Sequence, residues 1–146
     1  MTIQLLTDFF LRDVNKLKEE ITLYKNESDL WVLKGDVKNS GGTLALHLIG
    51  NLKHFIGAQL GNTGYIRQRD KEFSDRGIPK ENILKEIDET IVVLKKVLPT
   101  VKDADLEKEY PIKFLEEKRT IGYILLTLST HLSYHLGQIN YHRRLL

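Results

Sequence analysis

Apolar residues recur at intervals of three and four positions in several long stretches of this 146-residue chain. In the first stretch, about residues 3–25, they are Leu6, Phe10, Val14, Leu17, Ile21 and Tyr24. This spacing puts them on one face of an α-helix, because side chains three and four residues apart are neighbours on a helical surface. Such a helix must bury its apolar face against other elements, so the spacing limits the fold more than any other feature.

Three more stretches have the same period, and no segment predicts a credible β-sheet. Helices are expected over about residues 41–60, from Pro79 to Pro99, and from about Thr120 to the C-terminus, with Ser40 as N-cap of the second and Pro79 at the first position of the third. Their apolar stripes are Leu44, Leu48, Leu52 and Phe55; Ile83, Ile87, Ile91, Leu94 and Leu98; and Ile121, Leu125, Leu128, Leu132 and Ile139. Four amphipathic helices predict an all-α fold, a four-helix bundle.

The segments between the helices contain turn-forming and polar residues. The loop after the first helix is expected to tuck Leu30 and Trp31 inward. Residues 61–78 have no clear period, and a loop of this length between the second and third helices is usually functional or partly structured. Residues 110–115 are expected to form a short extended piece. Since neither a linker nor a repeat interrupts the chain, residues 1–146 are expected to form a single domain.

The composition of the chain excludes several classes of function. Its 22 basic and 20 acidic residues are spread along the chain with a net charge of +2, which argues against a nucleic-acid-binding stripe. The absence of cysteine rules out disulfides and thiolate ligands or nucleophiles. Asp8 and Arg12 come too early for a secretory signal, and no apolar run reaches the ~20 residues of a membrane span. We therefore expect a soluble, cytoplasmic protein with no nucleic-acid or membrane partner.

The histidines follow a pattern of their own. Three of the five lie within the last sixteen residues of the chain. Two helices each have a polar seam beside the apolar stripe, at positions i, i+4, i+7 and i+11: His131, His135, Gln138 and His142 on the last helix, and His47, Asn51, His54 and Ala58 on the second. If these seams face each other, they enclose a polar pocket between the two helices.

The spacing of the seams suits a metal site. Imidazoles at i and i+4, such as His131 and His135, lie about 5–6 Å apart at Cβ and can direct nitrogens at one cation. A third histidine from a facing helix would complete a three-nitrogen site with an open position. An ion there can lower the pKa of a bound water, polarise a substrate oxygen or hold a thiolate. The alternative is a hydrogen-bonded or solvent-facing pair, because H-x-x-x-H is common without metal.

Other chemistries find no support in the sequence. No glutamate lies three residues before a histidine, as a di-iron bundle site requires. The H-E-x-x-H, Walker A, G-x-G-x-x-G and G-x-S-x-G motifs are absent. Ser129 and Ser133 lie close to His131 and His135 in sequence, but a helix turns them toward other faces.

Three sequence features together resemble the DinB-like, or YfiT-like, metalloenzyme superfamily. They are "LALHLIGN" in the second helix, H-x-x-x-H in the last helix, and "HLGQI" directly after it. The stretches "GGTLALHLIGNLKHFIG" and "GNTGYIRQRDKEF" resemble an uncharacterised branch, and the resemblance covers nearly the whole chain. It implies a four-helix bundle, usually a homodimer, that binds one divalent ion (nickel, zinc or iron). The three ligands of the family match His47, His131 and His135.

The resemblance also implies an activity. Better-understood relatives are thiol-dependent S-transferases and isomerases, some of which use bacillithiol or mycothiol, and others are described as metal-dependent hydrolases. We therefore expect an enzyme in which the metal activates a low-molecular-weight thiol or water for transfer to a small electrophile. The alternatives are a non-catalytic, metal-stabilised binding or stress-response module and a helical interaction protein without metal.

The remaining polar residues of the seams have two interpretations each. His54 is expected to line the pocket or to act as a base, or else to be an ordinary polar edge residue. Asn51 and Gln138 are expected to orient ligands or bind substrate, or only to hydrogen-bond across helices. His142, near the end of the helix, is expected to be structural or exposed.

A group of charged residues in the long loop also has two interpretations. Arg67 and Arg69 lie in "YIRQRDKEF" with Asp70 and Glu72. The arginines, Arg67 in particular, could form an anion clamp that binds substrate. Alternatively, they form salt bridges that anchor the loop, or contacts in a dimer.

Overall fold

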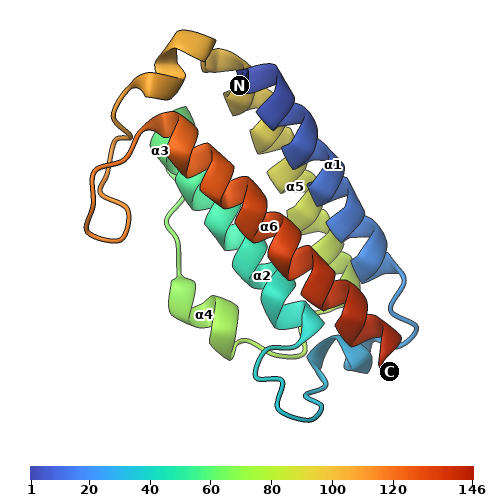
Figure 1. Cartoon of the computed structure of the whole chain (residues 1–146). Coiled ribbons are helices and arrows are strands. Elements are labelled where there is room, and N and C mark those ends of the chain that lie inside the picture. The colour runs from blue at the N-terminus through green and yellow to red at the C-terminus, as the bar shows by residue number, and fades with distance from the viewer.

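The computed structural model describes all residues from 1 to 146 and contains no β-strand. The long helices are α1 (Ile3–Thr22), α2 (Gly41–Leu52), α5 (Lys80–Val97) and α6 (Ile121–Arg144) (Figure 1). The short ones are α3 (Gln59–Gly61), α4 (Arg69–Ser74), the π-helical η2 (Lys53–Ala58), and the 3₁₀ helices η1 (Glu27–Trp31), η3 (Leu98–Thr100) and η4 (Asp103–Glu107). The predicted all-α class is confirmed.

The long helices bury their apolar stripes against one another. Helix α1 packs against α5 and α6, and α2 packs against α4, α5 and α6. In Figure 1, α6 and α2 lie side by side and run in opposite directions. Apart from the half-buried Phe55, every residue of the predicted stripes belongs to one buried core cluster. Because α2 is covered on several sides, nearly all of its residues are buried, including the polar His47 and Asn51.

The predicted second helix has an irregular turn inside it. The α-helical hydrogen bonding of α2 gives way at Lys53 to the π-helical η2, and Asn62 in the left-handed conformation (φ 49°) ends the helix after α3. Tyr110 supports this turn, since its hydroxyl donates a hydrogen bond to the Phe55 carbonyl oxygen at 2.6 Å. A π-helical segment has a hydrogen-bonding pattern different from that of an α-helix, so residues 53–58 depart from the single regular α-helix that was expected here.

Several connecting segments are more ordered than predicted. Residues 61–78 contain α4, which packs on α2. Leu30 is fully buried in η1 and Trp31 is half-buried, as expected. Residues 110–115 form no strand: one isolated bridge joins Phe114 to Glu117, and a second joins the flanking residues Glu109 and Thr120.

The helix starts follow the predicted capping residues. Ser40 Oγ accepts a hydrogen bond from the Thr43 amide at 3.2 Å. Pro79 was predicted to be the first residue of the third long helix. In the structure it is the N-cap of α5, and the helix begins one residue later, at Lys80. None of the helices combines the length and the apolar character that crossing a lipid bilayer requires.

Candidate metal centre

Three histidines from two helices meet at one point. His47 comes from α2, and His131 and His135 lie one turn apart on α6. The Nε2 atom of His131 is 3.1 Å from Nε2 of His47 and 3.0 Å from Nε2 of His135. The three rings stand nearly perpendicular to one another, with interplanar angles of 80°, 87° and 88°. The potential ligand atoms all lie within 4.8 Å of one another, so this group can hold a metal ion.

Two of these histidines have an oxygen acceptor at the other ring nitrogen. Nδ1 of His47 lies 3.1 Å from Glu72 Oε1, and Nδ1 of His135 lies 2.6 Å from Gln138 Oε1. An ionised carboxylate and an amide oxygen can only accept, so both contacts favour a proton on Nδ1. Arg67 Nη2 also lies 3.4 Å from Nδ1 of His47, but this donor is farther away than Glu72 Oε1. The Nε2 lone pairs of both rings then face the point where the three histidines meet.

The surroundings of the two histidines on α6 also favour neutral rings. Burial lowers the pKa of His131 to about 4, and the repulsion that Arg67 and a protonated His135 or His47 would exert on a charged ring adds to this shift. Burial lowers the pKa of His135 as well, against the opposing effect of the Gln138 hydrogen bond. Neutral imidazoles with inward lone pairs are the ligands that borderline divalent ions such as zinc prefer. The donor set therefore fits a metal ion.

Glu72 is the site residue that the sequence did not single out. The carboxylate is buried and accepts from Arg67 Nε and Nη2, both at 2.8 Å, as well as from His47. Burial alone would raise the pKa of Glu72, but the hydrogen bonds from Arg67 and His47 outweigh it and hold the pKa below its ordinary value. The structure thus shows the salt bridge that was one interpretation of this loop, in which Nε and Nη2 of Arg67 bind Glu72.

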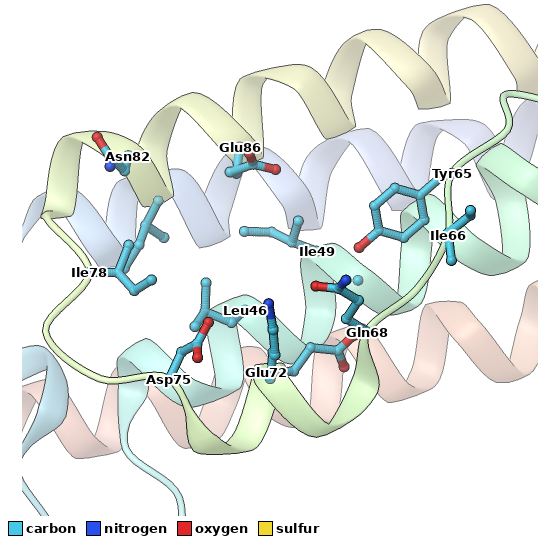
Figure 2. Close-up of a pocket in the computed structure, with 13 residues that line it drawn as sticks. Leu46, Ile49, Tyr65, Ile66, Gln68, Glu72, Asp75, Ile78, Asn82 and Glu86 are labelled. Atoms are coloured by element: carbon cyan, nitrogen blue, oxygen red, sulfur yellow. The ribbon is translucent and has the colours of Figure 1, made fainter.

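Glu72 reaches His47 because Gly50 leaves room for it. A Cβ atom at Gly50 would lie 2.0 Å from Glu72 Oε2. On this side of α2 there is a cavity of about 410 Å³ between α2, α4 and α5 (Figure 2). Glu72 forms part of its wall, whereas none of the three histidines does. The carboxylate therefore lies between this cavity and the candidate centre.

A second cavity lies beside the centre itself. Its volume is about 610 Å³, and its walls come from residues 34–39 and from α6, with Leu44 of α2. His135 and Gln138 both line it. The amide oxygen of Gln138 faces His135, so its amino group remains available to a molecule in the cavity.

The other predicted site residues have separate environments. His54 is half-buried beside Phe55, and burial followed by the charge of Arg67 lowers its pKa. Asn51 is only 7% exposed. Arg69 lies over the Phe73 ring at 5.1 Å. His142 is outside the centre: it is buried, with Nδ1 2.7 Å from the Tyr24 hydroxyl and Nε2 2.7 Å from the Val32 carbonyl oxygen. Its structural interpretation is therefore the one that the structure shows.

Comparison with known proteins identifies one family. A family model described as "Protein of unknown function (DUF1572)" matches residues 6–146. Neither the curated proteins nor the solved structures contain a match to the chain.

Proposed function

The chain belongs to the DUF1572 family, and we propose that it is a DinB-like metalloenzyme whose three histidines hold one divalent ion, nickel, zinc or iron. The observation that carries this proposal is the convergence of three Nε2 atoms from His47, His131 and His135. We further propose that residues 1–146 are a single DinB-like four-helix-bundle domain that works as a cytoplasmic homodimer. The packing of α1, α2, α5 and α6 supports that architecture.

The proposed reaction is the transfer of a thiol or a water molecule to a small electrophile, in the manner of an S-transferase or a hydrolase. When bound, the ion would supply Lewis acidity, which lowers the pKa of the attacking group and polarises the electrophile. This assignment suits a chain without cysteine, because no protein thiol is present to act as nucleophile.

The surrounding residues have roles in binding and proton transfer. The amino group of Gln138 donates to substrate in the 610 Å³ cavity beside His135. Arg67 keeps donor positions beyond those that bind Glu72, and these contact an anionic group. His54 is the proposed base, because its lowered pKa keeps the imidazole neutral and able to accept a proton from the thiol or water.

Metal content tests the proposed centre. Protein purified without a histidine tag is expected to contain about one divalent ion per chain, measured by plasma mass spectrometry. His47→Ala, His131→Ala and His135→Ala should each lose most of it, because two imidazoles bind far more weakly than three. His54→Ala is the matched control and should keep its metal. Full occupancy in all three ligand variants would rule out the site.

Turnover requires its own assay. The metal-loaded protein is expected to accelerate conjugation of a low-molecular-weight thiol to a model electrophile, and His54→Ala should lose rate about 10²-fold or more while keeping its metal. Metal binding without turnover in a broad screen of thiols and acceptors would instead favour the non-catalytic, metal-stabilised module.

A further inference from the structure

The exposed side of α6 carries no carboxylate, lysine or arginine over most of its length. From Ile121 to His142 this helix contains no aspartate, glutamate, lysine or arginine at all. The exposed sides of α1 and α5, by contrast, are charged along their length, for example at Lys16 on α1 and at Lys85 on α5. A helix face in water normally carries charged and polar residues, so α6 presents a surface of a different kind.

Large apolar side chains cover this face. Helix α6 lies between α1 and α2 (Figure 1). Six side chains on the exposed side of α6 and the adjoining part of α1 are 42–68% exposed: Leu5 and Phe9 from α1, and Tyr123, Leu126, Tyr134 and Tyr141 from α6. The four on α6 recur at helical spacing and therefore share one side of the helix. An exposed apolar patch that is rich in aromatic residues and poor in charge is typical of the core of a protein–protein interface.

The same face is hollowed at one place and projects at another. A cavity of about 340 Å³ opens between α1 and α6, with Leu5, Phe9, Leu126 and Thr130 in its wall. Tyr134, one turn beyond Thr130, is not part of this wall and is 65% exposed. A two-fold interface joins the same patch from both copies, so the patch must be complementary to itself. A hollow and a projecting aromatic ring on one face meet this requirement.

The lack of charge selects a second copy of the chain as the partner. Burying a charge without a counter-charge is costly, so an uncharged face pairs with another uncharged face. Among the long helices, α1 and α5 expose charged residues and α2 is almost entirely buried. Only α6 has a long uncharged exposed face, and a second copy supplies that face again.

We propose that two copies associate along α6 in antiparallel directions, with Tyr134 of each copy inserted into the 340 Å³ cavity of the other. Pairing Tyr134 of one copy with Leu126 of the other puts Thr130, which is midway between them in sequence, at the two-fold axis. This assignment gives the proposed homodimer its interface, and it rests on that part of the proposed function.

The interface adjoins the candidate metal centre. The ring centroids of Tyr134 and His135 are 5.2 Å apart, and both residues line the 610 Å³ cavity. A Tyr134 ring held by the second copy is a fixed wall of that cavity, so association limits the shape of the molecules that reach His135. The three histidines all come from one chain, so metal binding and association can be measured separately.

The first test is cross-linking through a single introduced thiol. The chain has no cysteine, so Thr130→Cys carries one thiol per copy and can form a disulfide only between copies. Mild oxidation is expected to convert most of this variant into a covalent dimer, because the two thiols meet at the axis. The control is Val92→Cys on α5, which is 64% exposed and should stay monomeric on a denaturing gel. Equal or stronger cross-linking at position 92 would overturn the assigned interface.

The second test is sedimentation equilibrium of the full chain. The wild type and Val92→Lys are expected to be dimers, Leu126→Lys to be a monomer, and Tyr134→Ala to dissociate about 30-fold more readily or more. A monomeric wild type, or a Leu126→Lys chain that stays dimeric, would contradict the proposal. Leu126→Lys should keep the metal content of the wild type, because the three histidines are unchanged. A wild-type dimer that binds no metal would instead refute the proposed metalloenzyme and leave the interface standing.

Discussion

At the scale of single residues, Gly50 determines how His47 is held. Glu72 comes from α4, and its carboxylate occupies the space that any side chain at position 50 would need. Here it bonds both Arg67 and His47. The sequence suggested a salt bridge for Arg67 but not the contact between Glu72 and His47, because these two residues are 25 positions apart along the chain. The convergence of His47, His131 and His135 was foreseeable, since helical spacing and the family resemblance both indicated it.

Replacing Gly50 with alanine is expected to displace Glu72, because the new Cβ would lie 2.0 Å from Oε2 and 2.6 Å from Cδ of its carboxylate. The His47 ring then loses its acceptor. Zinc affinity should fall about 10- to 100-fold, and the free energy of unfolding should fall by about 1–3 kcal/mol. Chelator competition and urea denaturation measure the two effects.

Gly137→Ala provides the matched control. Gly137 is also helical, but no atom lies within 4 Å of a Cβ built there. Alanine at this position should leave zinc affinity unchanged and raise the free energy of unfolding by about 0.5–1 kcal/mol. Equal zinc affinities for the Gly50 and Gly137 variants would show that Glu72 does not support His47.

At the scale of elements, the C-terminal part of α6 is fastened to α1. Glu20 of α1 is buried and accepts from Arg143 Nε at 2.7 Å and from Asn140 Nδ2 at 2.8 Å. One turn of α6 thus has two hydrogen bonds to the same carboxylate, and His142 on that turn bonds Tyr24. These contacts fix the position of α6 along its helix axis. They therefore help to set which part of α2 lies opposite His131 and His135.

The Glu20 carboxylate predicts a pH dependence of stability. Burial alone would raise the pKa of Glu20, but the hydrogen bonds from Arg143 and Asn140 outweigh it and lower the pKa below its ordinary value of 4.5. A lowered pKa in the folded state stabilises the protein above the unfolded-state pKa, and this contribution disappears as the pH falls through the folded-state pKa.

Glu20→Gln should therefore be less stable than wild type by about 1–3 kcal/mol at pH 7. The difference should shrink steadily once the pH falls below the ordinary value of 4.5. Urea denaturation of the wild type and of Glu20→Gln, from pH 7 to below pH 4.5, measures this difference in the free energy of unfolding. A difference that stays constant, or grows, with falling pH would contradict the assignment of the shift to Glu20.

The π-helical turn η2 is the element that sequence periodicity could not predict. Residues 53–58 continue the apolar stripe of α2, so a single regular helix was the natural prediction. The turn receives a tertiary contact that periodicity does not encode, the hydrogen bond from the Tyr110 hydroxyl to the Phe55 carbonyl oxygen. Helix α4 was missed for a related reason: it is only six residues long and is held by packing on α2.

Tyr110→Phe tests how much that contact stabilises the turn. The variant keeps the buried ring but leaves the Phe55 carbonyl oxygen without this donor, so the free energy of unfolding should fall by about 1–3 kcal/mol. Amide hydrogen exchange should also speed up within η2 more than in α1. Uniform exchange across both elements would indicate that Tyr110 supports the fold as a whole rather than the turn.

At the scale of the whole molecule, the candidate centre couples two distant parts of the chain. An ion that binds only the folded state stabilises it by mass action, by about 2.7 kcal/mol when free ion is 100-fold above its dissociation constant. Added zinc should therefore raise the melting temperature of metal-free protein measured by calorimetry. The doubly substituted His131→Ala, His135→Ala chain should show no rise, and an equal rise in both would place the zinc elsewhere.

The separation of His47 and His131 by 84 residues has a consequence for biosynthesis. A nascent chain that has emerged only through α5 contains one of the three converging imidazoles and nothing with which to complete the set. A growing polypeptide therefore could not capture an ion at this centre early. Loading would have to wait until α6 leaves the ribosome and docks on α2, so acquisition of the ion would report that these two helices have come together.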